Sequence, residues 1–257
     1  MAALGGRHAL ITGGGSGIGA AIARALAAEG AKLSLVGRRI EPLRAVAADC
    51  AGAAAISADI TDENDVARMM AAARAAHGPV DIVIANAGAA ESAPFGRSTL
   101  EQWNRMIAAN LTGAYLTAQA GMADLVRAGD AAPLRRLVFV ASTAGLKGYP
   151  YVAGYCAAKH GVVGLMRALA AEFASSPLTV NAVCPGFTET PLLAASIGTI
   201  TAKTGRSADD ARAMLARSNP QGRLITPEEV AATVLWLCRP EAASITGQAI
   251  SISGGEI

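Results

Sequence analysis

The chain has 257 residues, of which 52% are hydrophobic and 16% charged, and its formal net charge is +2. Such a composition supports a large apolar core and excludes a disordered chain or a strongly basic nucleic-acid-binding protein. No apolar run reaches the ~20 residues that a membrane span needs, and the N-terminus lacks the pattern of a signal peptide. We therefore expect a cytoplasmic protein with neither nucleic-acid nor membrane partners. The four cysteines form no Cys-x-x-Cys pair, so we expect no metal site.

Short apolar runs alternate with helical patterns in the first half of the chain. Gly30 and the pair Gly78-Pro79 are residue types that end helices. The alternation predicts βαβ units and a parallel sheet. Strands are expected at residues 8–11, 32–36, 54–57 and 81–85, with helices at 20–29, 41–49 and 61–77.

The second half continues this alternation, with one different segment at residues 187–220, rich in threonine, glycine and alanine. Thr226, Pro227 and Glu229 occupy the positions of an N-cap, a first helical residue and a capping-box partner. No repeat or linker divides the chain, so we expect one doubly wound domain over residues 1–257. Helices are expected at 99–127 (with weak points at Gly113 and Gly121), 154–175 and 226–238, and strands at 137–141, 178–183 and 245–252.

A glycine-rich loop, residues 12–19, follows the first strand and precedes the first helix. Glycines let a backbone approach a diphosphate closely, and the helix N-terminus beyond offers unpaired N–H groups. The spacing of Gly13, Gly17 and Gly19 in this context favours a dinucleotide site over a plain tight turn.

Three polar side chains are expected to meet where the strand at 137–141 ends. Ser142 follows that strand, and Tyr155 and Lys159 lie one helical turn apart on the next helix. Open α/β sheets bind ligands at the carboxyl ends of their strands. A surface Tyr–Lys pair is the alternative, but the upstream serine and glycine loop argue against it.

Together these motifs, with Asn86-Ala87-Gly88 and Asn110, resemble the short-chain dehydrogenase/reductase family in order and spacing. The resemblance covers essentially the whole chain. Residues 155–164 and 179–191 are particularly similar to 3-oxoacyl reductases, including polyketide ketoreductases; the family's usual Asn-Asn-Ala-Gly is Ala85-Asn86-Ala87-Gly88 here. The resemblance implies a single-domain Rossmann fold, with a doubly wound seven-stranded parallel sheet and helices on both faces. It also implies an oxidoreductase that interconverts a ketone and a secondary alcohol.

The second strand is followed by Arg38 and Arg39, with no acid before Glu41. An acid there would bind the ribose hydroxyls of NAD, whereas an arginine fork suits the 2′-phosphate of NADP. We therefore favour NADP(H), with NAD(H) as the alternative if Arg38 only stacks on adenine.

The resemblance also implies residue roles. Tyr155 is the acid in reduction and the base in oxidation, Ser142 binds the carbonyl, and Asn110 organises a proton relay. Lys159 lowers the pKa of Tyr155 and binds the nicotinamide ribose. The expected cofactor contacts are Gly13, Ser16, Gly17, Ile18, Gly19, Arg38, Arg39, Asp59, Ile60, Asn86, Ala87, Gly88, Tyr155, Lys159, Pro185, Gly186 and Thr188, although Asp59 could instead serve only as a helix-start acid.

Residues 187–220 occupy the place of the family's substrate lid. Basic residues there, Lys203, Arg206, Arg212 and Arg217, either meet a CoA- or carrier-linked thioester or simply face water; the second reading is favoured. We expect Tyr151 to line the substrate pocket, and Trp103 and Met106 to pack within the helix at 99–127.

The substrate is expected to be a ketone or alcohol, with a 3-oxoacyl thioester favoured. The alternatives are an NAD-linked dehydrogenase of a hydroxyacyl-CoA or small cyclic alcohol, and an NADP(H)-sensing protein without turnover. The resemblance further implies a homotetramer.

Overall fold

A computed structural model describes residues 2–127 and 134–257. Its seven strands form one parallel sheet in the order β3-β2-β1-β4-β5-β6-β7. The predicted fold class is therefore confirmed, although Met1 and residues 128–133 lie outside the described residues. The strands are β1 (His8–Thr12), β2 (Lys32–Gly37), β3 (Ala54–Ser57), β4 (Ile82–Ala85), β5 (Arg135–Val140), β6 (Leu178–Pro185) and β7 (Ala249–Ile252).

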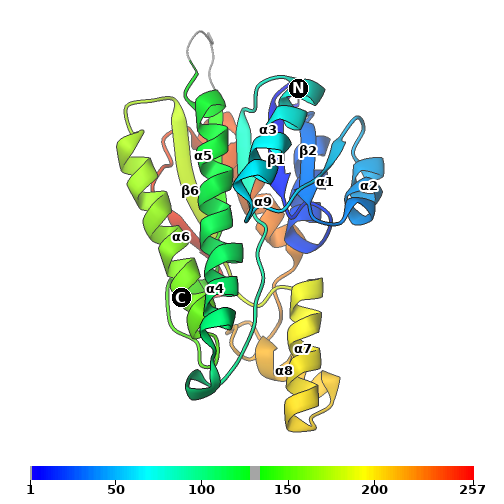
Figure 1. Cartoon of the computed structure of the whole chain (residues 1–257), viewed down its shortest axis with the longest axis vertical. Coiled ribbons are helices and arrows are strands. Elements are labelled where there is room, and N and C mark those ends of the chain that lie inside the picture. Colours follow the sequence, from blue (N-terminus) through cyan, green and yellow to red (C-terminus); the bar gives the residue numbers. More distant parts are fainter. Residues whose placement is uncertain (1, 128–133) are drawn as a thin grey trace.

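Helices cover both faces of the sheet because its strands are apolar on both sides. In β1, Ala9 and Ile11 join one core cluster while Leu10 joins the other. The first cluster lies under α1 (Gly17–Ala28), α2 (Ile40–Asp49) and α9 (Pro227–Cys238). The second lies under α3 (Glu63–His77), α5 (Gly113–Leu125) and α6 (Ala153–Glu172), the last two running side by side in Figure 1. No helix in the described parts of the chain is both long and apolar enough to cross a bilayer.

Several predicted bounds need correction. The helix expected at residues 99–127 is divided into α4 (Leu100–Ile107) and α5 by a π-helical turn at Ala108–Thr112. The predicted weak point at Gly121 is wrong, because this residue continues α5 and packs against Val83, where a Cβ atom would lie 2.8 Å from the valine side chain. The helix predicted at 154–175 ends at Glu172, and the strand predicted at 245–252 begins only at Ala249.

The segment at 187–220 contains α7 (Pro191–Thr204) and α8 (Ala208–Ala216), which extend beyond the sheet at the lower end of Figure 1. Its base is fixed to the body by Ile225, whose N–H donates to the Phe187 carbonyl and whose carbonyl accepts from Glu189 N–H. After it, Thr226 and Glu229 form the predicted capping box at the start of α9. The segment therefore lies beyond the end of the strand that precedes it.

Candidate active site

The glycine loop before α1 has the properties of a diphosphate cradle. Gly13 and Gly17 adopt positive φ angles of 67° and 51°, which side chains with a Cβ atom rarely adopt. Ser16 is the N-cap of α1, but its side chain makes no cap hydrogen bond, and no acidic residue lies in the first turn. The first N–H groups of α1 thus keep their capacity for an anion, and the helix dipole favours one there. The residues present fit a dinucleotide diphosphate.

The residues that follow β4 are hydrogen-bonded to this glycine loop. Asn86 Nδ2 donates to the Thr12 carbonyl at 2.8 Å, and the Thr12 hydroxyl accepts from the N–H groups of Asn86 and Ala87. A Cβ atom on Gly19 would lie 2.6 Å from Asn86 Nδ2 and 2.2 Å from the Gly13 carbonyl oxygen. Gly19 is therefore required by close packing. Thr12 was not singled out from the sequence, although it is the residue that couples the two loops.

The catalytic candidates converge where β5 ends and α6 begins. The Ser142 hydroxyl accepts from Ala144 N–H at 3.1 Å and lies near enough to the Tyr155 phenol to influence its pKa. Lys159 Nζ lies 5.6 Å from the centre of the Tyr155 ring and donates to the Val140 carbonyl at 2.9 Å. The structure thus brings the three predicted side chains together.

The electrostatics of this group differ from the expectation. Burial raises the pKa of Tyr155, and the Ser142 hydrogen bond opposes that rise. Burial also lowers the pKa of Lys159 to about 8, because the interior disfavours its ammonium form. The expectation that Lys159 lowers the phenol pKa is therefore not met by the chain's own groups, in which desolvation dominates.

Asn110 lies in the π-helical turn and is 1% exposed. Its Nδ2 donates to the carbonyls of Ala89 and Met106, and its Oδ1 accepts from Ala89 N–H. A Cβ atom on Gly88 would lie 2.6 Å from Asn110 Oδ1 and 3.7 Å from Lys159 Nζ. The asparagine side chain therefore fastens the loop after β4 beside the lysine, and its part in a proton relay stays a prediction.

The remaining predicted cofactor contacts lie on two sides of the site, one after β2 and β3 and the other after β6. Arg38 and Arg39 are exposed after β2, whereas Ile60 is 8% exposed and packs against Gly113 in the core. The Thr61 N–H and, more weakly, the charge of Arg38 lower the pKa of Asp59. Asp59 accepts from both the N–H and the hydroxyl of Thr61, which supports the helix-start alternative for this acid. At the other side of the site, Thr188 is buried and donates to the Gly186 carbonyl at 2.9 Å, which shapes the loop after Pro185.

A shallow depression lies at the start of α6. Tyr151 lies in it with a positive φ of 69° and a 65% exposed side chain, and its carbonyl accepts from Ala93 N–H. Trp103 and Met106 line the same depression, and a Cβ atom on Gly154 would lie within 3.6 Å of both side chains, so both pack between α4 and α6. That they pack rather than contact the substrate stays a prediction. The depression is lined by Glu91, Ala93, Phe95, Ser98, Gln102, Trp103, Met106, Tyr151, Val152, Ala153 and Gly154.

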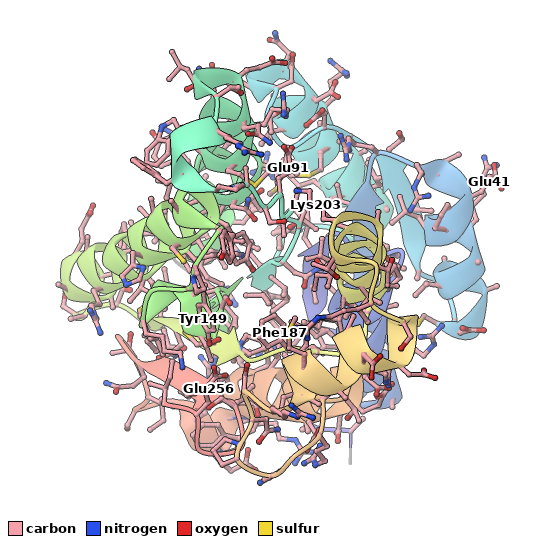
Figure 2. The ribbon with its side chains drawn as sticks, turned by 90° about the horizontal axis from the view of Figure 1, so that it is seen from below. Glu41, Glu91, Tyr149, Phe187, Lys203 and Glu256 are labelled. Atoms are coloured by element: carbon pink, nitrogen blue, oxygen red, sulfur yellow. The ribbon has the colours of Figure 1, made fainter. Side chains whose placement is uncertain are left out.

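Three of the four basic lid residues already have partners, among them Arg206, whose Nη1 donates to Met214 Sδ at 3.7 Å. Lys203 donates to the Ser92 carbonyl at 3.1 Å, and Arg212 pairs with Glu189. Figure 2 views the molecule from the lid end, so that Lys203, near the end of α7, lies close to the middle of this view. The Lys203 contact joins α7 to the loop after β4, and the Arg212–Glu189 pair offsets one positive charge that an anionic carrier could otherwise meet.

Known proteins resemble this chain over nearly its whole length. Residues 13–256 match the family model described as enoyl-(acyl carrier protein) reductase. A D-beta-hydroxybutyrate dehydrogenase of Rhizobium meliloti is 35% identical, covering 97% of this chain and 98% of the relative.

Two crystal structures share the fold closely. Actinorhodin polyketide ketoreductase with NADPH, in a variant form, has a TM-score of 0.90 and 34% identity, covering 97% of each chain. A 3-ketoacyl-(acyl-carrier-protein) reductase from Brucella melitensis complexed with NADH has a TM-score of 0.88 and 33% identity, covering 98% of this chain and 99% of that one. The chain therefore belongs to the short-chain dehydrogenase/reductase family and is an oxidoreductase that interconverts a ketone and an alcohol.

Proposed function

We propose that this protein is an NADP(H)-dependent ketone reductase whose favoured substrates are 3-oxoacyl thioesters. The convergence of Ser142, Tyr155 and Lys159 beside the loop after β4 carries the proposal. When bound, NADP(H) supplies or accepts the hydride. Gly13, Ser16, Gly17, Ile18 and Gly19 would hold its diphosphate and Arg38 and Arg39 its phosphate, while Asp59, Ile60, Asn86, Ala87, Gly88, Pro185, Gly186 and Thr188 would line the rest of its path.

The side chains of the site then handle the proton and orient the carbonyl. Tyr155 donates its phenolic proton to the carbonyl oxygen, while Ser142 donates a hydrogen bond to the same oxygen. Burial raises the pKa of Tyr155, so the phenol is protonated at neutral pH and ready to act as an acid. Lys159, held by the Val140 carbonyl, lies with its Nζ 5.6 Å from the centre of the Tyr155 ring and would contribute positive charge beside the phenolate that remains.

Replacing Tyr155 by phenylalanine tests the proton-donor role. We expect Tyr155→Phe to bind NADPH normally but to lose turnover by about 100-fold or more, the usual contribution of a positioned acid. Tyr115→Phe is the matched control, because Tyr115 is a partly exposed tyrosine of α5. Retained turnover in Tyr155→Phe would refute the assignment, and normal binding without any ketone reduction by the wild type would favour the NADP(H)-sensing alternative.

The preference for NADP(H) rests on Arg38 and Arg39, together with the absence of an acid at the end of β2. We expect Arg38→Leu to reduce kcat/KM for NADPH far more than for NADH, because a guanidinium pairs with a phosphate but only stacks on adenine. Arg44→Leu removes another exposed arginine of α2, one that pairs with Glu41 at 3.0 Å, and serves as the control. A wild type that prefers NADH would instead support the NAD-linked alternative.

The substrate class is tested with paired compounds. Free 3-oxo esters, N-acetylcysteamine thioesters and CoA thioesters of the same acyl chain separate recognition of the ketone, the thioester and the carrier. A low KM confined to the thioesters would support the proposal, whereas faster turnover of small cyclic ketones would support the alternative. A homotetramer and a cytoplasmic location also remain predictions, the first of which light scattering would test.

A further inference from the structure

A compact group of polar side chains lies outside the catalytic trio, where the C-terminal tail meets the turn after Ser142. The Tyr149 hydroxyl is 2.7 Å from Thr143 Oγ1 and 2.7 Å from Glu256 Oε1. Lys147 Nζ reaches the same Glu256 oxygen at 2.9 Å and lies 5.0 Å from the centre of the Tyr149 ring. The Glu256 side chain is only 5% exposed, so its charge is neutralised within this group.

The hydrogen bonds have one consistent direction. Ionised Glu256 can only accept, so the Tyr149 hydroxyl donates its single proton to Glu256 and accepts from the Thr143 hydroxyl. Burial raises the pKa of Tyr149, so its phenol stays protonated and the chain of bonds is complete at neutral pH. Thr143 is itself 3% exposed, and it directly follows the candidate carbonyl-binding serine.

The group also contacts the loop that begins the lid. The Tyr149 and Phe187 rings meet edge to face with centroids 6.0 Å apart. The other oxygen of Glu256, Oε2, is the nearest atom to the position that a Cβ atom on Gly186 would occupy, at 3.4 Å. Figure 2 shows Tyr149, Phe187 and Glu256 gathered on one side of the site, far from Glu41 on α2. Three segments that are distant in sequence thus meet here: the turn after β5, the exit of β6 and the C-terminal tail.

We propose that Lys147, Tyr149 and Glu256 form a clamp that fixes Phe187 relative to Ser142, so that the C-terminal tail determines how a ketone is oriented in the site. The clamp residues are positioning residues. They act through Ser142, whose hydroxyl is oriented by the turn that Thr143 begins, and through Phe187, the first residue of the lid. This inference rests on the proposed ketone reduction. It identifies the C-terminal tail as the part of the chain that selects which face of the carbonyl reacts.

Product handedness tests the clamp, because an enantiomer ratio does not depend on how much of the enzyme is folded. The assay reduces ethyl 3-oxobutanoate and ethyl 3-oxo-3-phenylpropanoate with wild type, Tyr149→Phe and Glu256→Gln, and resolves the alcohols by chiral chromatography. We expect the ratio to fall on the order of tenfold for both variants, since a small misplacement of a bound substrate has effects of this size or larger. The double variant should be little worse than either single variant, because both changes weaken the same group: Tyr149→Phe removes the hydroxyl that donates to Glu256, and Glu256→Gln removes the charge that pairs with Lys147.

Asp49→Asn is the matched control, since it removes a carboxylate that pairs with Arg24 at 2.8 Å on α1, away from this group. It should leave the enantiomer ratio unchanged. An unchanged ratio in Tyr149→Phe and Glu256→Gln, with only a lower melting temperature, would overturn the clamp.

A wild type that reduces neither ketone would refute the proposed reaction on these substrates, and the clamp would then be judged by hydrogen exchange. We expect the amides of Gly145, Leu146 and Gly186 to exchange faster in Tyr149→Phe, while those of α1 exchange as in the wild type. Unchanged exchange at all three amides would overturn the clamp independently of turnover.

Discussion

The buried ammonium of Lys159 should lower the free energy of unfolding of the protein. Its pKa is lowered to about 8 from an ordinary value of 10.5, because burial disfavours the charged form. Between these two values the unfolded chain binds more protons than the folded one, so stability rises with pH through this window. The penalty is fully present below about pH 8. At pH 7 it amounts to about 3 kcal/mol, at 1.36 kcal/mol for each pKa unit.

Lys159→Met removes that penalty. The change also removes the donor to the Val140 carbonyl, which is 2.9 Å from Lys159 Nζ, at a cost of about 1 kcal/mol. We therefore expect the variant to be more stable than the wild type by about 2 kcal/mol at pH 7, while losing activity. At pH 9.5 the wild-type penalty falls to about 1 kcal/mol, so the advantage of the variant should nearly disappear.

The assay is urea unfolding of nucleotide-free protein at pH 7 and pH 9.5, followed by far-UV circular dichroism. Lys32→Met, at an exposed lysine of β2, controls for the loss of one surface charge. It should show no pH-dependent advantage. A Lys159→Met protein that is less stable than the wild type at pH 7, or whose advantage is independent of pH, would refute the reasoning.

The order of the elements could be predicted because each strand and helix carries a local signal. Gly30 and Gly78, for example, adopt positive φ angles just beyond the ends of α1 and α3, where the sequence predicts helix ends. The π-helical turn at Ala108–Thr112 has no such signal. Its asparagine side chain is bound to Ala89 and Met106, and the contact with Ala89 is tertiary, formed only after the loop behind β4 has folded against α4.

The residues of the site also divide into those that a local sequence pattern predicts and those that only the folded chain brings together. Ser142, Tyr155 and Lys159 could be predicted because a strand end and one helical turn suffice to bring them together. Glu256 could not, since it lies 107 residues from Tyr149 and only the pairing of β6 with β7 brings the tail to this edge of the sheet. The direction of the Tyr155 pKa shift could not be predicted for a related reason: the sequence shows which charges are neighbours but not how completely they are buried, and burial is the largest cause of the pKa shifts of both Tyr155 and Lys159.

Three further changes probe the scaffold around the site. Thr226→Ala should lower the free energy of unfolding by about 1 kcal/mol, measured by urea unfolding, because it removes the hydroxyl that caps α9; Thr226→Ser should restore most of it. Burial lowers the pKa of His8, so its neutral form favours the fold and stability should fall as the pH drops below about 6.5; the slope should flatten in His8→Asn, and an equal slope would contradict this. Gly88→Ala should impair turnover more than NADPH binding, because its Cβ atom would lie 2.6 Å from Asn110 Oδ1 and 3.7 Å from Lys159 Nζ. Gly148→Ala is the control, since nothing lies within 4 Å of its Cβ position. Equal turnover in the two alanine variants would show that the loop after β4 does not hold the asparagine and the lysine in their working positions.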